Sequence, residues 1–179
     1  MFDVTAFIEQ CRSALAEPDP RDVIGALMRE TLEDPESVQR VMDGQPDNER
    51  QLYRADDLTV LNVDLPPGLK TPPHDHTMWA VIGIYEGQED NTFYHEEGSG
   101  LTKSHAIVLK PRDVLVVSPE DIHAIANPLS TRTRGLHVYG GDLPASERTL
   151  WHPKTQQREP YTVEAMARYV AELMQEEVS

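Results

Sequence analysis

The chain has 179 residues, 39% of them hydrophobic, and is long enough to bury the core of one domain. Its 31 acidic residues against 16 lysines and arginines give a formal net charge of −15. Such a surface repels phosphate backbones and anionic lipid headgroups, so neither nucleic-acid binding nor membrane binding is expected. With Cys11 as its single cysteine, the chain has no intrachain disulfide, and no apolar run reaches signal-peptide or membrane-span length. We therefore expect a cytoplasmic protein with a small-molecule partner.

The first 45 residues are expected to be helical. A first helix is predicted by apolar residues with the spacing of one helix face, namely Val4, Phe7, Ile8, Cys11 and Leu15. Pro20 suits the first turn of a second helix. A short third helix is predicted after Pro35, ending near Gly44.

Residues 50–152 have a different pattern, with short apolar runs separated by Pro, Gly, Asn and Asp. The runs have strand length, recur roughly every 8 to 15 residues, and no helix-length periodicity interrupts them. This pattern predicts an antiparallel sandwich or barrel rather than alternating strands and helices.

The last part of the chain is again expected to be helical, over residues 161–177. A start is offered by Thr162, and an apolar face is formed by Val163, Met166, Ala167, Val170, Leu173 and Met174. We read residues 1–179 as one domain, in which a helical region (1–45) and a C-terminal helix (161–177) pack against a β-barrel (50–152).

Two histidines stand one residue apart in the stretch TPPHDHTMW, at His74 and His76. Side chains at i and i+2 of a strand project to the same face, so the two imidazoles can converge on one ion. A lone histidine in a strand is more often structural or exposed. We expect this of His95, His105 and His152.

The surroundings of these histidines resemble the cupin superfamily, the double-stranded β-helix barrels. The pair Pro67-Gly68 is separated from His74 by five residues, as in the first cupin motif. The second motif is matched by SPEDIHAIANP, in which His123 follows a proline-containing turn and Asn127 stands four residues later, although the usual glycine of that turn is missing. The resemblance implies a mainly β cupin fold and a metal site made of His74, His76 and His123.

A typical cupin also has a carboxylate ligand five residues after the second histidine, and that position is Val81 here. Glu86 and Glu89 are nearby but out of register, and the segment from Glu89 to Asn91 is expected to be a turn. Three neutral imidazoles with open coordination positions suit Fe(II), Zn or Cu by ligand softness.

His137 and Tyr139 form a second pair at i and i+2, in the stretch GLHVYGG. They are either core residues with satisfied polar atoms, or a histidine that orients a tyrosine hydroxyl toward the open side of the metal. Arg148, nine residues after Tyr139, is a candidate for bidentate binding of a substrate carboxylate. Arg50 and Arg54 are rivals for that role.

The order HDHxxW, then a single histidine with a downstream asparagine, then HxYG resembles the thiol dioxygenase branch of the cupins. This branch includes cysteine dioxygenase and 3-mercaptopropionate dioxygenase, which bind Fe(II) through three histidines and oxidise a thiol to a sulfinate with dioxygen. His137 and Tyr139 match the last two members of its Ser-His-Tyr relay, and Arg148 falls about where the mercaptopropionate enzymes bind a carboxylate. Two departures stand out: Gly135 replaces the relay serine, and Val81 stands where animal cysteine dioxygenases carry a cross-linked cysteine.

The resemblance implies a non-haem Fe(II) dioxygenase acting on a small thiol acid such as 3-mercaptopropionate or cysteine. Two alternatives stay open. One is another cupin metalloenzyme, a carbon–carbon cleaving dioxygenase or an isomerase that uses Zn, Mn or Ni. The other is a metal- or small-molecule-binding cupin without activity, for which Gly135 would mark lost catalysis. A homodimer is compatible with the resemblance.

Overall fold

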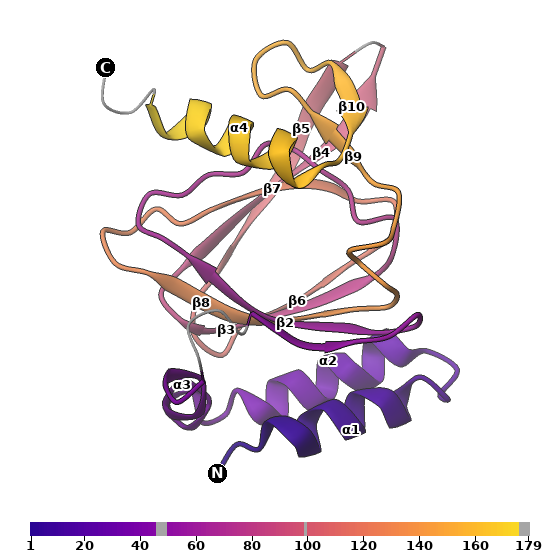
Figure 1. Ribbon diagram of the computed structural model, residues 1–179, viewed down its shortest axis with the longest axis vertical. Coiled ribbons are helices and arrows are strands. Elements are labelled where there is room, and N and C mark those ends of the chain that lie inside the picture. The colour runs from indigo at the N-terminus through magenta and orange to yellow at the C-terminus, as the bar shows by residue number, and fades with distance from the viewer. Residues whose placement is uncertain (46–49, 99, 176–179) are drawn as a thin grey trace.

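The computed structural model describes residues 1–45, 50–98 and 100–175. Three helices come first: α1 (Val4–Ala14), α2 (Pro20–Thr31) and α3 (Pro35–Asp43). Each is capped by an aspartate, Asp3, Asp19 or Asp34, whose carboxylate accepts a hydrogen bond from a backbone N–H of the first turn. The predicted helical N-terminal region is confirmed, and the three helices lie together beneath one end of the β-structure (Figure 1).

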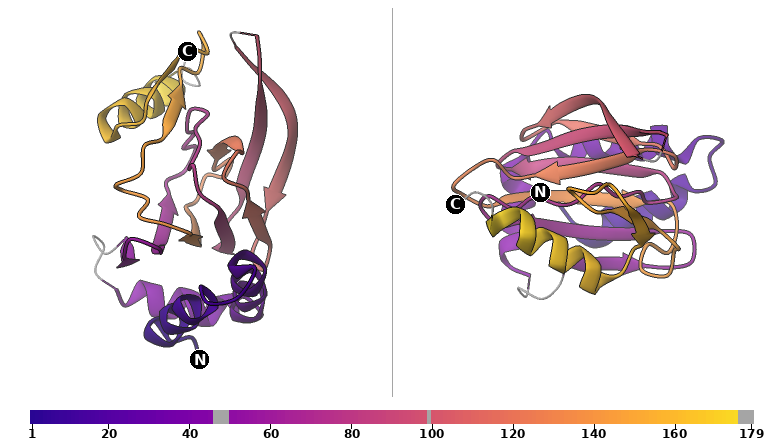
Figure 2. Two further views of the ribbon diagram at one scale, coloured as in Figure 1. Left: turned by 90° about the vertical axis from the view of Figure 1, so that its right-hand side faces the viewer. Right: turned by 90° about the horizontal axis from the view of Figure 1, so that it is seen from above.

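The middle of the chain is antiparallel β-structure. Its strands are β1 (Gln51–Arg54), β2 (Thr59–Leu65), β3 (Ala80–Glu86), β4 (Glu89–Glu97), β5 (Gly100–Leu109), β6 (Val114–Val117), β7 (Ile122–Ala126), β8 (Thr133–Tyr139), β9 (Thr149–Trp151) and β10 (Arg158–Pro160). A five-stranded sheet has the order β1-β2-β8-β3-β6, a three-stranded sheet has the order β5-β4-β7, and β9 pairs with β10. The two larger sheets face each other across the barrel interior (Figures 1 and 2).

An extended segment between β2 and β3 lies beside β7 and completes the three-stranded sheet. Backbone bridges join Lys70 to Ala126 and His74 to His123. The chain then passes from β2 in the large sheet to this segment, back to β3, across to β4 and β5, back to β6, across to β7 and back to β8. This winding is that of a double-stranded β-helix, as the sequence predicted.

The sequence of β3, AVIGIYE, is apolar at nearly every position because this strand is covered on both faces. Val81 belongs to the apolar cluster shared with the N-terminal helices, and Ile82 belongs to the cluster inside the barrel. At Gly83, a Cβ would lie 2.6 Å from Cγ of Met28 and 2.7 Å from Cδ1 of Leu32. The absence of a side chain at this position lets the second helix approach the sheet closely.

Helix α4 (Val163–Gln175) lies at the opposite end of the barrel from the N-terminal helices (Figure 1). It starts after Thr162, whose hydroxyl accepts a hydrogen bond from the Ala165 N–H at 3.0 Å. It confirms the predicted C-terminal helix as far as Gln175, while residues 176 and 177 of that prediction lie outside the described residues. None of the described helices has the length and apolar character needed to cross a membrane.

Candidate metal centre

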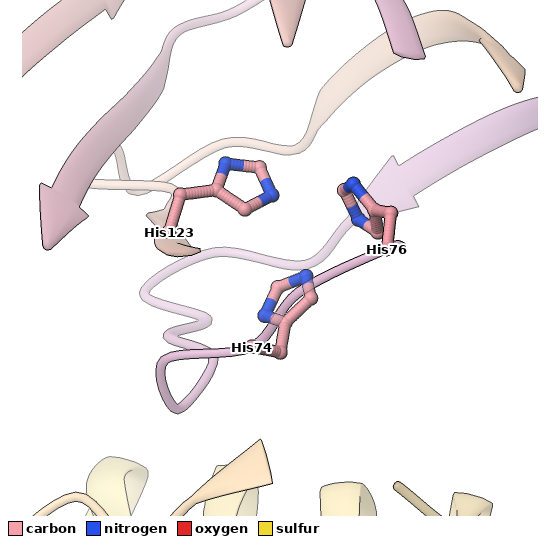
Figure 3. Close-up of side chains that lie close together, drawn as sticks. All are labelled: His74, His76 and His123. Atoms are coloured by element: carbon pink, nitrogen blue, oxygen red, sulfur yellow. The ribbon is translucent and has the colours of Figure 1, made fainter. Parts of the chain in front are cut away.

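Three imidazoles meet inside the barrel, those of His74, His76 and His123. Each offers one ring nitrogen, and these nitrogens lie within 4.8 Å of one another. The rings face a common point (Figure 3), with centroids 4.8 to 5.1 Å apart. All three residues are buried, with 6%, 4% and 1% of their surface exposed. The spacing and burial fit a group of ligands to one metal ion.

Backbone hydrogen bonds join the segment that carries His74 and His76 to strand β7, which carries His123. His74 N–H donates to the His123 carbonyl at 2.8 Å, and His123 N–H donates back to the His74 carbonyl at 2.9 Å. His74 also forms a bridge to Leu150 of β9. The segment around His74 and His76 is therefore extended and anchored at single bridges instead of forming the regular strand that the motif predicted.

The hydrogen bonds of the rings leave nitrogen lone pairs for a metal. Nδ1 of His74 lies 3.0 Å from the Pro72 carbonyl, so this nitrogen carries the proton. Nδ1 of His123 lies 2.9 Å from Oδ1 of Asn91, while its Nε2 is buried with no hydrogen-bond partner among the described residues. Nδ1 of His76 is buried and unpartnered in the same way. Buried ring nitrogens without a hydrogen-bond partner are expected where a metal takes that place.

Burial also keeps these imidazoles neutral, which is their ligand form. It lowers the pKa of His74 to about 4. It lowers the pKa values of His76 and His123 well below their usual range, with further lowering by neighbouring imidazoles. The three ligand candidates are therefore deprotonated at neutral pH, and their nitrogen-only donor set suits Fe(II), Zn or Cu.

His137 and Tyr139 of β8 reach the same interior. Together with the three histidines they line a small cavity of about 70 Å³. The Tyr139 hydroxyl lies 3.2 Å from Nδ1 of His137, and its ring centroid is 5.1 Å from that of His76. Burial raises the pKa of the Tyr139 phenol above its usual value, so the hydroxyl keeps its proton. Both side chains therefore border the space that the three histidines enclose.

Beside this cavity, a larger one of about 340 Å³ connects the histidines with two arginines. It is lined by His74 and Tyr139 and also by Arg50 and Arg148. Arg148 is half-buried, its Nε has no hydrogen-bond partner within the described part of the chain, and its Cζ lies 3.6 Å from the centroid of the Tyr161 ring. Arg50 is exposed at the rim.

The third arginine considered from the sequence, Arg54, is engaged elsewhere. Its guanidinium donates to both carboxylate oxygens of Asp142, at 2.8 and 3.0 Å. It does not line the cavity that holds the histidines. Of these three arginines, Arg148 and Arg50 line the cavity that also borders His74 and His76.

The predicted turn from Glu89 to Asn91 is wrong. The turn comes earlier, at Gly87, whose φ of 79° suits glycine, and β4 starts at Glu89. Glu89 and Asn91 lie on the inner face of β4 together with Phe93, and both polar residues are fully buried. These two residues were not predictable as part of a strand, because a strand is usually recognised by apolar residues at its inward positions and here those positions are polar.

Position 81, where the cupin motif has a carboxylate ligand, faces the N-terminal helices in this structure. Val81 is fully buried against the N-terminal helices, and its neighbour Ile82 lines the small cavity. A ligand at position 81 would point away from the three histidines.

No protein-family model matches the chain. Parts of it are similar to solved structures. A DMSP lyase from Ruegeria pomeroyi shares 24% identity and a TM-score of 0.44 over 56% of this chain and 46% of that chain. A cupin superfamily protein from Desulfitobacterium hafniense shares 23% identity and a TM-score of 0.43 over 55% and 83%. A Klebsiella pneumoniae protein with a double-stranded beta-helix domain shares 18% identity and a TM-score of 0.41 over 59% and 83%. This chain matches about half the length of the DMSP lyase, and its similarity to these three structures is a similarity of fold.

Proposed function

We propose that this protein is a metal-dependent enzyme of the cupin type, and specifically a non-haem Fe(II) dioxygenase that oxidises a small thiol acid to its sulfinate. The observation that carries the proposal is the donor set. Within residues 1–45, 50–98 and 100–175, no carboxylate or thiol joins His74, His76 and His123. Three neutral ligands leave several coordination positions open and suit a reaction in which two reactants meet at one centre.

Fe(II), when bound, would supply adjoining positions at which a thiolate and dioxygen meet. The residues around it have separate tasks. Arg148 binds the substrate carboxylate, and Tyr139, held by His137, presents its hydroxyl oxygen to the bound reactants. Ile82 and Ile125 line the small cavity and limit access of water to it. The overall change, RSH + O₂ → RSO₂H, balances without a further reductant.

Oxygen uptake by Fe(II)-reconstituted protein tests the proposal, with 3-mercaptopropionate, cysteine and cysteamine as substrates and with the product identified by mass. We expect one O₂ consumed per sulfinate formed for a thiol that carries a carboxylate, and much less uptake with cysteamine. A His123→Ala variant, which lacks one ligand, serves as the control for oxidation by free iron. Uptake equal to that control with all three thiols would contradict the proposal.

The size and lining of the larger cavity favour a second candidate, a cupin metalloenzyme that acts on a bulkier acid without a thiol. The cavity of about 340 Å³ has an apolar wall that includes Leu61, Leu143 and Met166, more room than a three-carbon acid requires. The metal content of natively purified protein separates the two candidates. Iron with thiol-dependent uptake supports the first, whereas Zn, Mn or Ni without it supports the second.

A further inference from the structure

Glu89 is a fully buried carboxylate in the barrel interior. Such a group is unfavourable unless it is hydrogen-bonded or paired. Its Oε1 accepts a hydrogen bond from the Asn91 amide at 2.9 Å. Its Oε2 lies 3.6 Å from Nε2 of His137, and both of these atoms are buried without another hydrogen-bond partner in the described residues. A small movement joins them, and no water fits between atoms this close.

The relay serine of the thiol dioxygenases would stand at the position of Gly135, and a serine side chain does not fit there. The partner of His137 in this chain is a carboxylate instead. A Cβ at this position would lie 2.8 Å from the Gly83 carbonyl oxygen and 2.9 Å from Cδ1 of Ile84, which is closer than Cβ atoms normally come to their neighbours. The same Cβ would be 3.4 Å from Nε2 of His137. The place from which a serine would reach this nitrogen is closed, and Glu89 approaches it from β4.

We propose that Glu89 is a positioning residue that holds a proton on Nε2 of His137 and thereby controls the direction of the Tyr139 hydroxyl. A carboxylate only accepts hydrogen bonds, so Nε2 is the protonated nitrogen of the neutral ring. Nδ1 then accepts the Tyr139 O–H at 3.2 Å.

The same carboxylate also orients a candidate metal ligand. The NH₂ group of Asn91 donates to Glu89, which fixes the direction of the amide and leaves Oδ1 facing His123. Nδ1 of His123 donates to that oxygen at 2.9 Å, so its Nε2 is free of a proton. One buried carboxylate thus assigns the protons of two histidines, the candidate metal ligand His123 and the Tyr139 partner His137.

Nitrogen NMR of histidine-labelled, Zn(II)-loaded protein tests this inference, because the shifts of the two ring nitrogens show which one carries the proton. His137→Gln identifies the signals of His137. We expect Nε2 to be protonated in the wild-type protein. In Glu89→Gln the single amide oxygen is taken by Asn91 and an N–H faces His137, so we expect the proton to move to Nδ1.

Asp90→Asn is the matched control. It makes the same change of charge one residue along β4, where the carboxylate accepts from Gln88 on the opposite face of the strand. The His137 signals should not change in this variant. A wild-type ring protonated on Nδ1 alone, or an unchanged ring in Glu89→Gln, overturns the inference. If Glu89→Gln does not fold, the wild-type measurement decides.

The effect on turnover rests on the proposed function. With iron saturating, Glu89→Gln should lower kcat for thiol oxidation by roughly ten- to a hundredfold and leave KM close to the wild-type value. A purely structural loss would not produce this split. The NMR result does not depend on thiol chemistry. If the protein oxidises no thiol but the His137 ring is protonated as expected, the proposed function is refuted and the role of Glu89 is upheld.

Discussion

Arg148 and Arg50 differ in burial although they line the same cavity. The half-buried guanidinium of Arg148 stacks on Tyr161, and its Nε has no hydrogen-bond partner among the residues that the structure describes, so it is the group that gains most from binding a carboxylate. Arg148→Ala should raise KM for a carboxylate-bearing thiol by about ten- to a hundredfold, with little change in iron content. Steady-state kinetics with metal analysis measures both.

Arg50→Ala should raise KM by much less, because this side chain is exposed and water competes for its hydrogen bonds. Arg54→Ala, which removes a surface pair with Asp142, is the control. A larger KM effect at Arg50 than at Arg148 would show that the carboxylate anchor has been assigned to the wrong arginine.

Site residues with a recognisable motif spacing were predictable from the sequence, and those without one were not. The motif spacing selected His74, His76 and His123, and the structure brings their rings together. Glu89 was misread because the stretch EDN has the composition of a turn, whereas in the structure Glu89 begins β4 and pairs with Leu109 of β5. Only tertiary structure brings this carboxylate beside His137, from a strand far away in the sequence.

At the scale of elements, the contact between α2 and β3 is set by Gly83. A methyl group there would press on Met28 and Leu32, both fully buried. Gly83→Ala should therefore lower the free energy of unfolding by about 1–3 kcal/mol, as overpacked cores do. Urea denaturation followed by circular dichroism measures the change.

Gly25→Ala is the matched substitution on the helix side of the same layer. Its Cβ would meet Arg29 and Val116 at 3.5 and 3.7 Å, which are ordinary contact distances. Because alanine favours a helix interior over glycine, this variant should be unchanged or more stable by about 0.5–1 kcal/mol. Equal destabilisation by both substitutions would contradict the packing role assigned to Gly83.

The helices and most strands were predictable because their signals are local. Capping aspartates, proline at the helix start and apolar spacing identify α1 to α3 without knowledge of the fold. Strand β10 and the segment around His74 were not predicted as they occur, since each forms only a short stretch of pairing. Their conformation is imposed by neighbouring strands that the local sequence does not encode.

At the scale of the whole molecule, stability should depend on pH and metal together. Burial depresses the pKa of His74 from 6.5 to about 4, so in metal-free protein only the unfolded state takes up a proton there between these values. Stability is therefore fully present above pH 6.5 and is lost as the pH falls toward 4, by about 1.4 kcal/mol per pH unit for each such imidazole. Thermal unfolding of the metal-free protein from pH 7.5 to 5 measures this loss.

His74→Gln should make that dependence shallower, whereas the same substitution at the exposed His95 should leave it as in the wild type. Adding Zn(II) at a hundred times its dissociation constant should stabilise the wild-type protein by about 2.7 kcal/mol at neutral pH. If the stability of the wild type and of His74→Gln depends on pH in the same way, the assignment of this pH dependence to His74 is contradicted.

Helix α4 shares its inner side with the larger cavity, where Met166 and Val170 form part of the wall. It is attached through a small apolar cluster and, among its described residues, buries Ala165 and Tyr169. Helix α2, by contrast, is anchored in the main core. We therefore expect the backbone amides of α4 to exchange with deuterium faster than those of α2. Since paired strands hold the candidate metal ligands, we expect opening of α4, and not movement of those strands, to let molecules into the larger cavity.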